Sequence, residues 1–203
     1  MTNKYLVMIA LSLCTNFAFG QQKLVKDIDF DGVQDTVYLD AETSEIVCRL
    51  SGTKFKKISS KGIDESADFV HIGATKNGFE CRINWMRAGY ANQFRYNKAL
   101  KKVQLIGMSR YEFGNAANDG SGESSVNLLT GDYIGDWNYF DDLANKGNGE
   151  LIKIPQIKTK LLFKQTFLED FSVANYELYA DSCSKLYEQA KARTKLLKTH
   201  TKS

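Results

Sequence analysis

Residues 68–85 read DFVHIGATKNGFECRINW and carry the clearest structural signal in the chain. Asn77-Gly78 favours a two-residue turn with positive φ, and apolar residues alternate with polar ones on both sides of it. A turn at this dipeptide predicts three facing pairs that put the apolar side chains on one face: Ala74 with Cys81, Ile72 with Ile83, and Val70 with Trp85. We therefore predict an antiparallel hairpin here.

The same pattern predicts two further hairpins. One covers residues 92–113 and turns around 98–101, and the other covers 124–139 with Thr130-Gly131 at its tip. A turn at Thr130-Gly131 predicts three facing pairs: Leu128 with Tyr133, Val126 with Gly135, and Ser124 with Trp137. Shorter strands are expected at 36–39, 46–50 and 55–58. Hairpins that follow one another without helices form an antiparallel meander, so we expect a mainly β fold, propeller-like or a barrel or sandwich.

The domain organisation is predicted to be simple. The chain has a single proline, Pro155, and no linker-like segment, so residues 21–203 are expected to form one domain. A short C-terminal helix is predicted over 184–198, with Asp181 or Ser182 as N-cap and with Leu186, Ala190 and, as a further candidate, Leu197 on one side. The alternating stretch 175–180 could be a last strand, and 161–171 carries no clear pattern.

The first twenty residues have the features of a signal peptide. Lys4 supplies a positive start, residues 6–13 are apolar but too short to span a bilayer, and Ala18-Phe19-Gly20 is a cleavage signal. We expect export to the periplasm or outside the cell, with cleavage after Gly20. The alternative is a lipoprotein acylated on Cys14, although Leu13 is bulkier than that processing prefers. No later segment is apolar for long enough to cross a membrane.

Charge composition names no partner. Loss of Lys4 with the leader reduces the 27 basic residues to 26, against 24 acidic residues, so the mature chain is nearly neutral. The C-terminal stretch 185–202 is basic but lacks interleaved aromatic residues, which favours a solvated terminus over a nucleic-acid site.

The sequence DIDFDGVQD at residues 27–35 is the strongest chemical signal. Its alternating aspartates can point their carboxylates to one centre, and Gly32 permits the sharp bend. Calcium prefers six to eight oxygen ligands at about 2.3–2.6 Å. The predicted ligands are Asp27, Asp29, Asp31, Asp35 and the backbone carbonyl of Val33. A solvated acidic turn, or a metal ion other than calcium, is the alternative, and the lack of His and Cys disfavours zinc or copper.

This loop differs from a helix-loop-helix calcium site, whose twelfth residue is a bidentate Glu, because Tyr38 stands there and a strand follows. The pattern Asp-x-Asp-x-Asp-Gly-x-x-Asp leading into a strand resembles the calcium loops of FG-GAP and VCBS-type repeats of extracellular β-propellers. The resemblance covers residues 27–39 and implies bound Ca²⁺. It implies nothing about an activity.

A wider resemblance rests on residues 108–139, which include a Leu-Thr-Gly-Asp turn at 129–132. This stretch is similar to a family of uncharacterised bacterial secreted proteins related to a periplasmic calcium-binding inhibitor of animal-type lysozyme, whose fold is propeller-like. The resemblance implies a binding protein whose partner is a host or envelope protein such as lysozyme. Other families of lysozyme inhibitors carry Ser-Gly-x-x-Tyr, whereas this chain has Ser-Gly-Glu-Ser-Ser at 121–125, without the tyrosine.

The polar loop 115–125 would be the inhibitory element if inhibition is the function. It would fill the sugar-binding cleft of a cationic enzyme, with Asp119 and Glu123 meeting the positive rim. The alternatives are an ordinary connection, or a second cation site built from Asn118, Asp119, Ser121 and Glu123.

An enzyme is the other functional class. The chain has only two histidines, His71 and His200, so a hydrolytic triad could draw only on His71, which is expected on the polar face of the first hairpin. Paired carboxylates of a cell-envelope hydrolase could come from a set near polar loops: Glu112, Glu123, Asp132 and Asp136. No catalytic residue is assigned.

Three cysteines remain after the leader, an odd number for an oxidising compartment. Cys48 and Cys81 are expected to be buried, and a bridge between them requires neighbouring strands. The aromatic and arginine-rich stretches 85–87 and 90–96 are interpreted either as core or as a binding surface.

Overall fold

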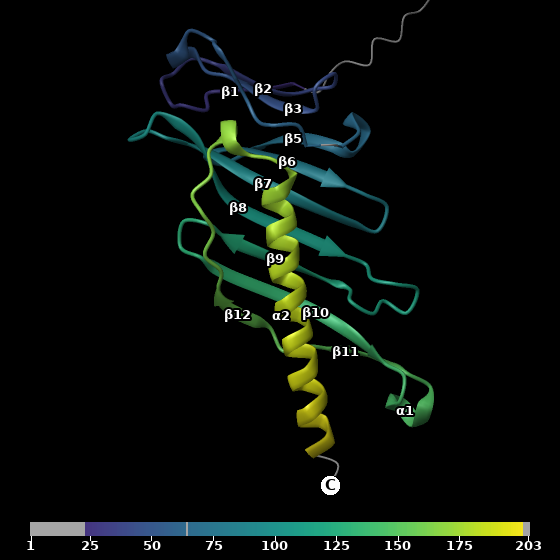
Figure 1. Cartoon of the computed structure of the whole chain (residues 1–203). Helices are drawn as coiled ribbons and strands as arrows, with labels where there is room; N and C mark the ends of the chain where they lie inside the picture. Colours follow the sequence, from purple (N-terminus) through teal and green to yellow (C-terminus); the bar gives the residue numbers. More distant parts are fainter. Residues whose placement is uncertain (1–22, 64, 201–203) are drawn as a thin grey trace, which may run out of the picture.

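The computed structural model of the protein describes residues 23–63 and 65–200, and the predicted leader, residues 1–20, lies outside this part. Figure 1 shows two antiparallel sheets and one long helix. The strands of the small sheet lie in chain order: β1 (Lys23–Lys26), β2 (Asp35–Asp40), β3 (Glu45–Arg49) and β4 (Lys57–Ser59). The strand predicted at 55–58 begins later because Lys54 and Phe55 both have positive φ.

The large sheet has the strand order β11-β10-β9-β8-β7-β6-β5, and β12 pairs with β10 on the same edge as β11. Its strands are β5 (Val70–Thr75), β6 (Gly78–Asn84), β7 (Ala88–Asn97), β8 (Lys102–Glu112), β9 (Gly122–Asn127), β10 (Asp132–Asp141), β11 (Glu150–Lys153) and β12 (Ile157–Lys160). The short helical turns are η1 (Ser51–Thr53), η2 (Ala67–Phe69), α1 (Ala144–Gly147) and η3 (Leu168–Asp170). The predicted mainly β, antiparallel fold is confirmed, and over the described residues neither sheet closes into a barrel.

The first predicted hairpin is β5–β6, but its register differs from the prediction by two residues. Ile72 faces Cys81 rather than Ile83, and Thr75 faces Gly78, so that the turn is Lys76-Asn77. Gly78 is a strand residue without positive φ, and a Cβ on it would lie 2.0 Å from the carbonyl oxygen of Phe94 in β7. The glycine is therefore required by close approach of two strands. A shift of two residues keeps every side chain on its predicted face.

The third predicted hairpin, β9–β10, shows a shift of the same size. Val126 faces Tyr133 and Ser124 faces Gly135, so four residues, 128–131, connect the strands. The Asn127 carbonyl accepts hydrogen bonds from the N–H groups of Thr130 and Gly131, and its side chain accepts one from Leu129. Asn127 therefore closes the wider turn, which the sequence dipeptide alone did not predict.

The terminal helix α2 (Val173–His200) starts well before the predicted 184. The Ser172 N–H donates to the Asn175 side chain at 2.9 Å, which caps the true start. The strand considered for 175–180 and the N-caps Asp181 and Ser182 are therefore wrong. The side chains that pack against the sheet are Tyr176, Tyr179 and Cys183, and their spacing of three and then four residues is helical, whereas a strand would bury every second residue.

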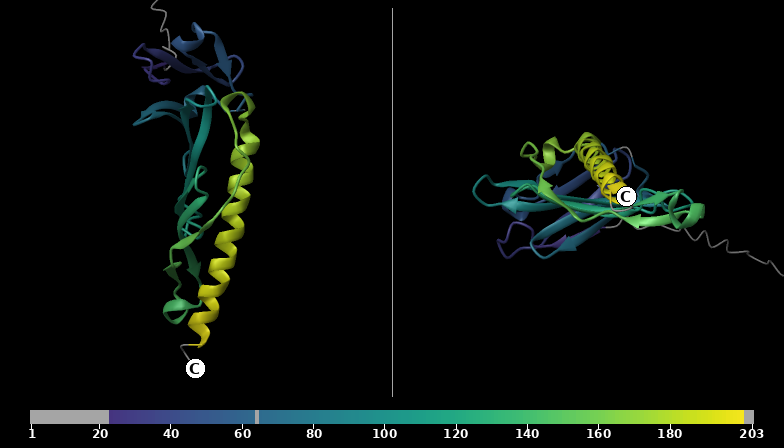
Figure 2. Two further views of the ribbon diagram at one scale, coloured as in Figure 1. Left: turned by 90° about the vertical axis from the view of Figure 1, so that its left-hand side faces the viewer. Right: turned by 90° about the horizontal axis from the view of Figure 1, so that it is seen from below.

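Helix α2 covers one face of the large sheet, as Figure 2 shows, and no described helix covers the other. Tyr176 stacks on Tyr90 of β7, with ring centroids 3.6 Å apart, and Cys183 is buried. Leu186 and Ala190 pack against the cores on the sheet side, as predicted. The helix buries a face that the sheet could not cover by itself.

A single apolar core joins the two sheets. It contains Val37 and Ile46 of the small sheet together with Ile72, Phe79 and Phe94 of the large sheet. At the edge of this junction, the Lys26 ammonium group donates hydrogen bonds to three carbonyl groups of the β5–β6 turn region, those of Thr75, Lys76 and Gly78. The end of β1 is thereby fixed against the large sheet.

Replacement of Gly78 by alanine should destabilise the protein by about 2–3 kcal/mol, because the added methyl group must displace backbone of β7. Gly107→Ala is the matched control, since its Cβ would meet its nearest neighbour at 3.4 Å, an ordinary contact. Urea denaturation of both variants measures the difference. Equal stability of the two variants would show that β6 and β7 are not in close contact at Gly78.

Candidate functional site

The acidic loop, defined as residues 27–35, lies between β1 and β2. The carboxylates of Asp27, Asp29 and Asp35 each place one oxygen within 4.8 Å of the others. Two oxygens bound to one ion at about 2.4 Å can be at most about 4.8 Å apart, so the three groups can share a single calcium ion. Gly32 has φ of +90°, which supplies the bend that the sequence predicts.

Backbone N–H groups hold two of these carboxylates in place. Asp35 is fully buried and accepts hydrogen bonds from the N–H groups of Ile28 at 2.6 Å, Asp29 at 3.2 Å and Ser51 at 2.8 Å. Asp27 accepts from the N–H groups of Phe30, Asp31 and Gly32. Hydrogen bonds of this kind stabilise the ionised form of a carboxyl group, which is the form that binds a cation.

Asp29 is the most crowded of the three. Burial, followed by the negative charges of Asp35 and Asp31, raises the pKa of its carboxyl group, while the N–H groups of Gly52 and Asp31 oppose this shift. The crowding is the electrostatic cost of placing like charges close together with little water between them. A divalent cation would remove that cost.

Two of the predicted ligands, Asp31 and Val33, are outside the converging group. Asp31 is not among the three converging carboxylates; its carboxylate accepts hydrogen bonds from the Ser51 hydroxyl at 2.7 Å and the Val33 N–H at 2.8 Å. These hydrogen bonds hold the pKa of Asp31 below its ordinary value, with the Ser51 bond as the main cause. Val33 is half exposed at the surface of the loop. Participation of Asp31 and of the Val33 carbonyl in metal binding stays a prediction.

The turn η1 completes the site from the β3–β4 connection, and sequence reasoning missed it. Ser51 and Gly52 donate to Asp35, Asp31 and Asp29. A Cβ on Gly52 would lie 2.7 Å from an Asp29 carboxylate oxygen, so a larger residue here would displace that carboxylate. The Ser-Gly pair carries no local signal for this role, because sixteen residues separate Ser51 from Asp35.

Nearby cations do not neutralise the acidic loop. Lys26 points to the β5–β6 turn, and the Lys98 ammonium group lies over the Phe30 ring, 5.2 Å from its centroid. No ion pair to Asp27, Asp29 or Asp35 is found among the described residues. Tyr96 of β7 lies close enough that the aspartates, after burial, raise the pKa of its hydroxyl group.

The second predicted site, residues 115–125, is only partly a loop. Gly122–Asn127 is strand β9, so Glu123 lies within the large sheet and not on a protruding loop. Asp119 does lie in the loop, but its carboxylate accepts the Phe140 N–H at 2.7 Å and pairs with Lys191 of α2 at 3.5 Å. These contacts fix the loop to β10 and to the helix. Among the described residues, no second group of three Asp, Glu, His or Cys side chains converges, and a cation site that also uses Asn118 and Ser121 stays a prediction.

The sheet brings two of the four candidate hydrolytic carboxylates together. Glu123 faces Asp136 across β9 and β10, on the face that α2 leaves open. Arg82, Tyr111 and Ser109 join them around a hollow of about 260 Å³. Asp136 also accepts a hydrogen bond from Gln156 at 2.8 Å. The remaining two are held elsewhere: Glu112 pairs with Arg110, and Asp132 with Lys160.

The other candidate groups serve packing. Cys48, Cys81 and Cys183 are buried free thiols, and no disulfide joins Cys48 to Cys81. Burial raises the pKa of the Cys81 thiol to about 12, so this group is un-ionised at neutral pH. His71 faces Arg82 on the exposed side of β5.

The aromatic stretches 85–87 and 90–96 contribute mainly to the contact between the sheet and α2. Trp85 and Tyr90 pack on each other and on Tyr176 of α2, whereas Met86 is exposed. The core interpretation therefore holds for these two rings.

No family model, no curated protein and no solved structure matches the chain. Among residues 23–63 and 65–200, no helix is both long enough and apolar enough to cross a membrane. The inference of function therefore rests on the geometry of the acidic loop and of the open sheet face.

Proposed function

We propose that the protein is an exported binding module stabilised by calcium. The convergence of Asp27, Asp29 and Asp35 carries this proposal, because three like charges within 4.8 Å are unfavourable unless a cation joins them. The export pattern of residues 1–20 and the resemblance of residues 27–39 to extracellular calcium loops support it. Location in the periplasm or outside the cell follows from that export pattern.

Calcium fits the donor set better than other ions. All the donors are carboxylate or carbonyl oxygens, which suit hard cations, and the loop contains no His or Cys. Asp27, Asp29 and Asp35 would hold the ion, with Asp31 and the Val33 carbonyl as the further ligands that the loop spacing predicts. The ion would stabilise the fold, because the same carboxylates bind η1 and thereby join the β1–β2 and β3–β4 connections.

Calcium should raise the melting temperature, and EDTA should lower it. At a free concentration of about 100 times the dissociation constant, the ion adds about 2.7 kcal/mol to the free energy of unfolding. Asp29→Asn should remove this response and should melt at a higher temperature than the wild type in EDTA, because one crowded charge is lost. Differential scanning calorimetry and calcium titration calorimetry measure both effects.

Asp142→Asn is the matched control, since Asp142 is an exposed aspartate outside the acidic loop, and it should respond to calcium as the wild type does. Absence of any heat of calcium binding at millimolar concentration, together with an unchanged melting temperature, would disprove the calcium site.

The binding partner that the resemblance over 108–139 favours is an animal-type lysozyme. Inhibition would occur by contact of the open sheet face around β9 with the rim of the enzyme's cleft, because Glu123 does not lie on a protruding loop. Glu123 is the acidic group available for this contact, since Asp119 is engaged by Lys191 and Phe140. A lysozyme assay on bacterial cell walls should show inhibition that Glu123→Lys weakens by at least tenfold, since a like charge would face the cationic rim. Full lysozyme activity in the presence of excess protein would exclude this partner.

A second candidate function is a cell-envelope hydrolase, favoured by the facing positions of Glu123 and Asp136. Directly opposed residues of an antiparallel pair have Cβ atoms about 4.5–5.5 Å apart, so the two side chains share one part of the open face. A pair of carboxyl groups on one surface is the arrangement that glycosidases use. Like charges in this position are unfavourable in a sheet, and the ion pair of Asp136 with Lys153 at 3.7 Å offsets part of their repulsion. The hollow beside them is of the size of a sugar ring.

Turnover of peptidoglycan by the purified protein tests this second candidate. Glu123→Gln or Asp136→Asn should abolish turnover, while Asp132→Asn, which removes a carboxylate paired with Lys160, should leave it unchanged. If wild-type protein releases no soluble fragments during prolonged incubation, the hydrolase is excluded and the binding module remains.

A further inference from the structure

The connections that follow β1, β3, β5 and β7 lie at one end of the molecule, because alternate connections of antiparallel strands return to the same side. Figure 1 shows them on the left of the view. Two of them contact the acidic loop, and a third contacts Lys26, the residue that precedes it. Asp31 accepts the Ser51 hydroxyl, Lys98 lies over Phe30, and Lys26 donates to the β5–β6 turn region. We call this end the loop edge.

Four large apolar side chains of the loop edge are exposed to solvent. Their exposed fractions lie between 43% and 51%, and they are Phe30, Val33, Phe55 and Leu100. Each of the three connections that follow β1, β3 and β7 contributes at least one of them. The chain leaves these apolar groups exposed at the tips of neighbouring loops, and exposed apolar patches of this kind mark sites of contact with a membrane or another protein.

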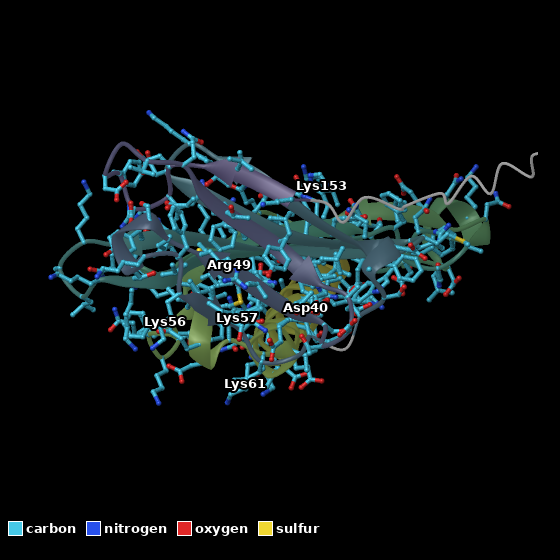
Figure 3. All side chains as sticks on the ribbon, turned by 90° about the horizontal axis from the view of Figure 1, so that it is seen from above. Asp40, Arg49, Lys56, Lys57, Lys61 and Lys153 are labelled. Carbon is cyan, nitrogen blue, oxygen red and sulfur yellow. The ribbon has the colours of Figure 1, made fainter. Side chains whose placement is uncertain are left out.

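Five lysines stand among these apolar groups, and all are exposed: Lys54, Lys56, Lys76, Lys98 and Lys101. Figure 3 looks down on the small sheet and shows Lys56 beside Lys57 and Arg49. Lys57 is paired with Asp40 and Glu45, whereas none of the five makes an ion pair within the described part of the chain. Exposed lysines that alternate with apolar tips are suited to an anionic interface.

Two of the exposed phenylalanines occupy strained backbone conformations. Phe30 has φ of 64° and Phe55 has φ of 58°, the left-handed region that bulky side chains rarely adopt. Asparagine or glycine would be less strained at either position. An exposed aromatic ring on strained backbone is not explained by packing, and such strain is typical of functional surfaces.

We propose that the loop edge docks on an anionic lipid bilayer, with the apolar tips entering the headgroup region and the lysines contacting the lipid charges. Calcium control of this docking rests on the proposed calcium site. Without the ion, the four aspartates of the acidic loop oppose the positive charge of the five lysines and repel the bilayer. Bound calcium adds two positive charges at the centre of the edge and removes most of that repulsion.

Flotation of the full chain with lipid vesicles tests the proposal. Vesicles of equal parts phosphatidylglycerol and phosphatidylcholine should bind the protein in calcium and bind it at least tenfold more weakly in EDTA. Vesicles of phosphatidylcholine alone should not bind it measurably, because they give the lysines no anionic partner. Calcium titration calorimetry on the same preparation, without lipid, reports the ion site separately.

The variant Phe55→Asn/Leu100→Asn leaves the acidic loop unchanged and should weaken vesicle binding roughly tenfold or more, because two apolar insertions are lost. Lys54→Gln/Lys101→Gln should weaken binding only to the anionic vesicles. The matched control is Met86→Asn/Leu143→Asn, which removes two exposed apolar side chains outside the loop edge and should bind as the wild type does.

A measurable heat of calcium binding, without flotation of the protein, would overturn the docking proposal while leaving the calcium site intact. Equal flotation in calcium and in EDTA would show that calcium does not regulate vesicle binding. If titration calorimetry also detects no heat of calcium binding, the calcium site itself is refuted. Unaltered flotation of Phe55→Asn/Leu100→Asn would exclude this edge as the contact. Loss of lysozyme binding in that variant, with no vesicle binding by the wild type, would assign the edge to a protein partner and overturn the proposal.

Discussion

Like-charge crowding in the acidic loop is the constraint on which the organisation of this end of the molecule depends. Asp27, Asp29 and Asp35 converge although no described basic side chain pairs with them, and backbone N–H groups hold them in place. Some of those N–H groups belong to η1, which lies in a different connection. The carboxylates therefore join two loops that are separate in the chain. A cation at their centre would strengthen the same junction.

The junction has consequences for the neighbouring loops. The acidic loop contacts the β7–β8 turn through Phe30 and Lys98, and the preceding Lys26 fixes the β5–β6 turn. Changes in the charge of the acidic loop therefore act on a surface that contains apolar tips and unpaired lysines. This arrangement would connect the proposed ion site to a surface property, without requiring any large conformational change.

The two faces of the large sheet have separate roles. The face under α2 is mainly apolar and aromatic, and one polar contact across the helix interface joins Ser124 to Tyr179 at 2.8 Å. The opposite face has polar side chains and presents Glu123 beside Asp136. Helix α2 covers one face of the large sheet, so any contact of the sheet with a partner or substrate must use the opposite face.

The sequence by itself determined which side chains share a face and that an acidic loop precedes the second strand, because a period of two and the spacing of aspartates are local properties. Tertiary structure decided the register of the β5–β6 hairpin, since the close approach of Gly78 to Phe94 moved its turn, whereas the wider β9–β10 turn is closed locally by Asn127. Tertiary structure also decided the length of α2, since the sheet stabilises the first turns of the helix, and it placed Gly52 beside Asp29. Contacts between residues far apart in the chain leave no periodic signal, so these features could be known only from the folded molecule.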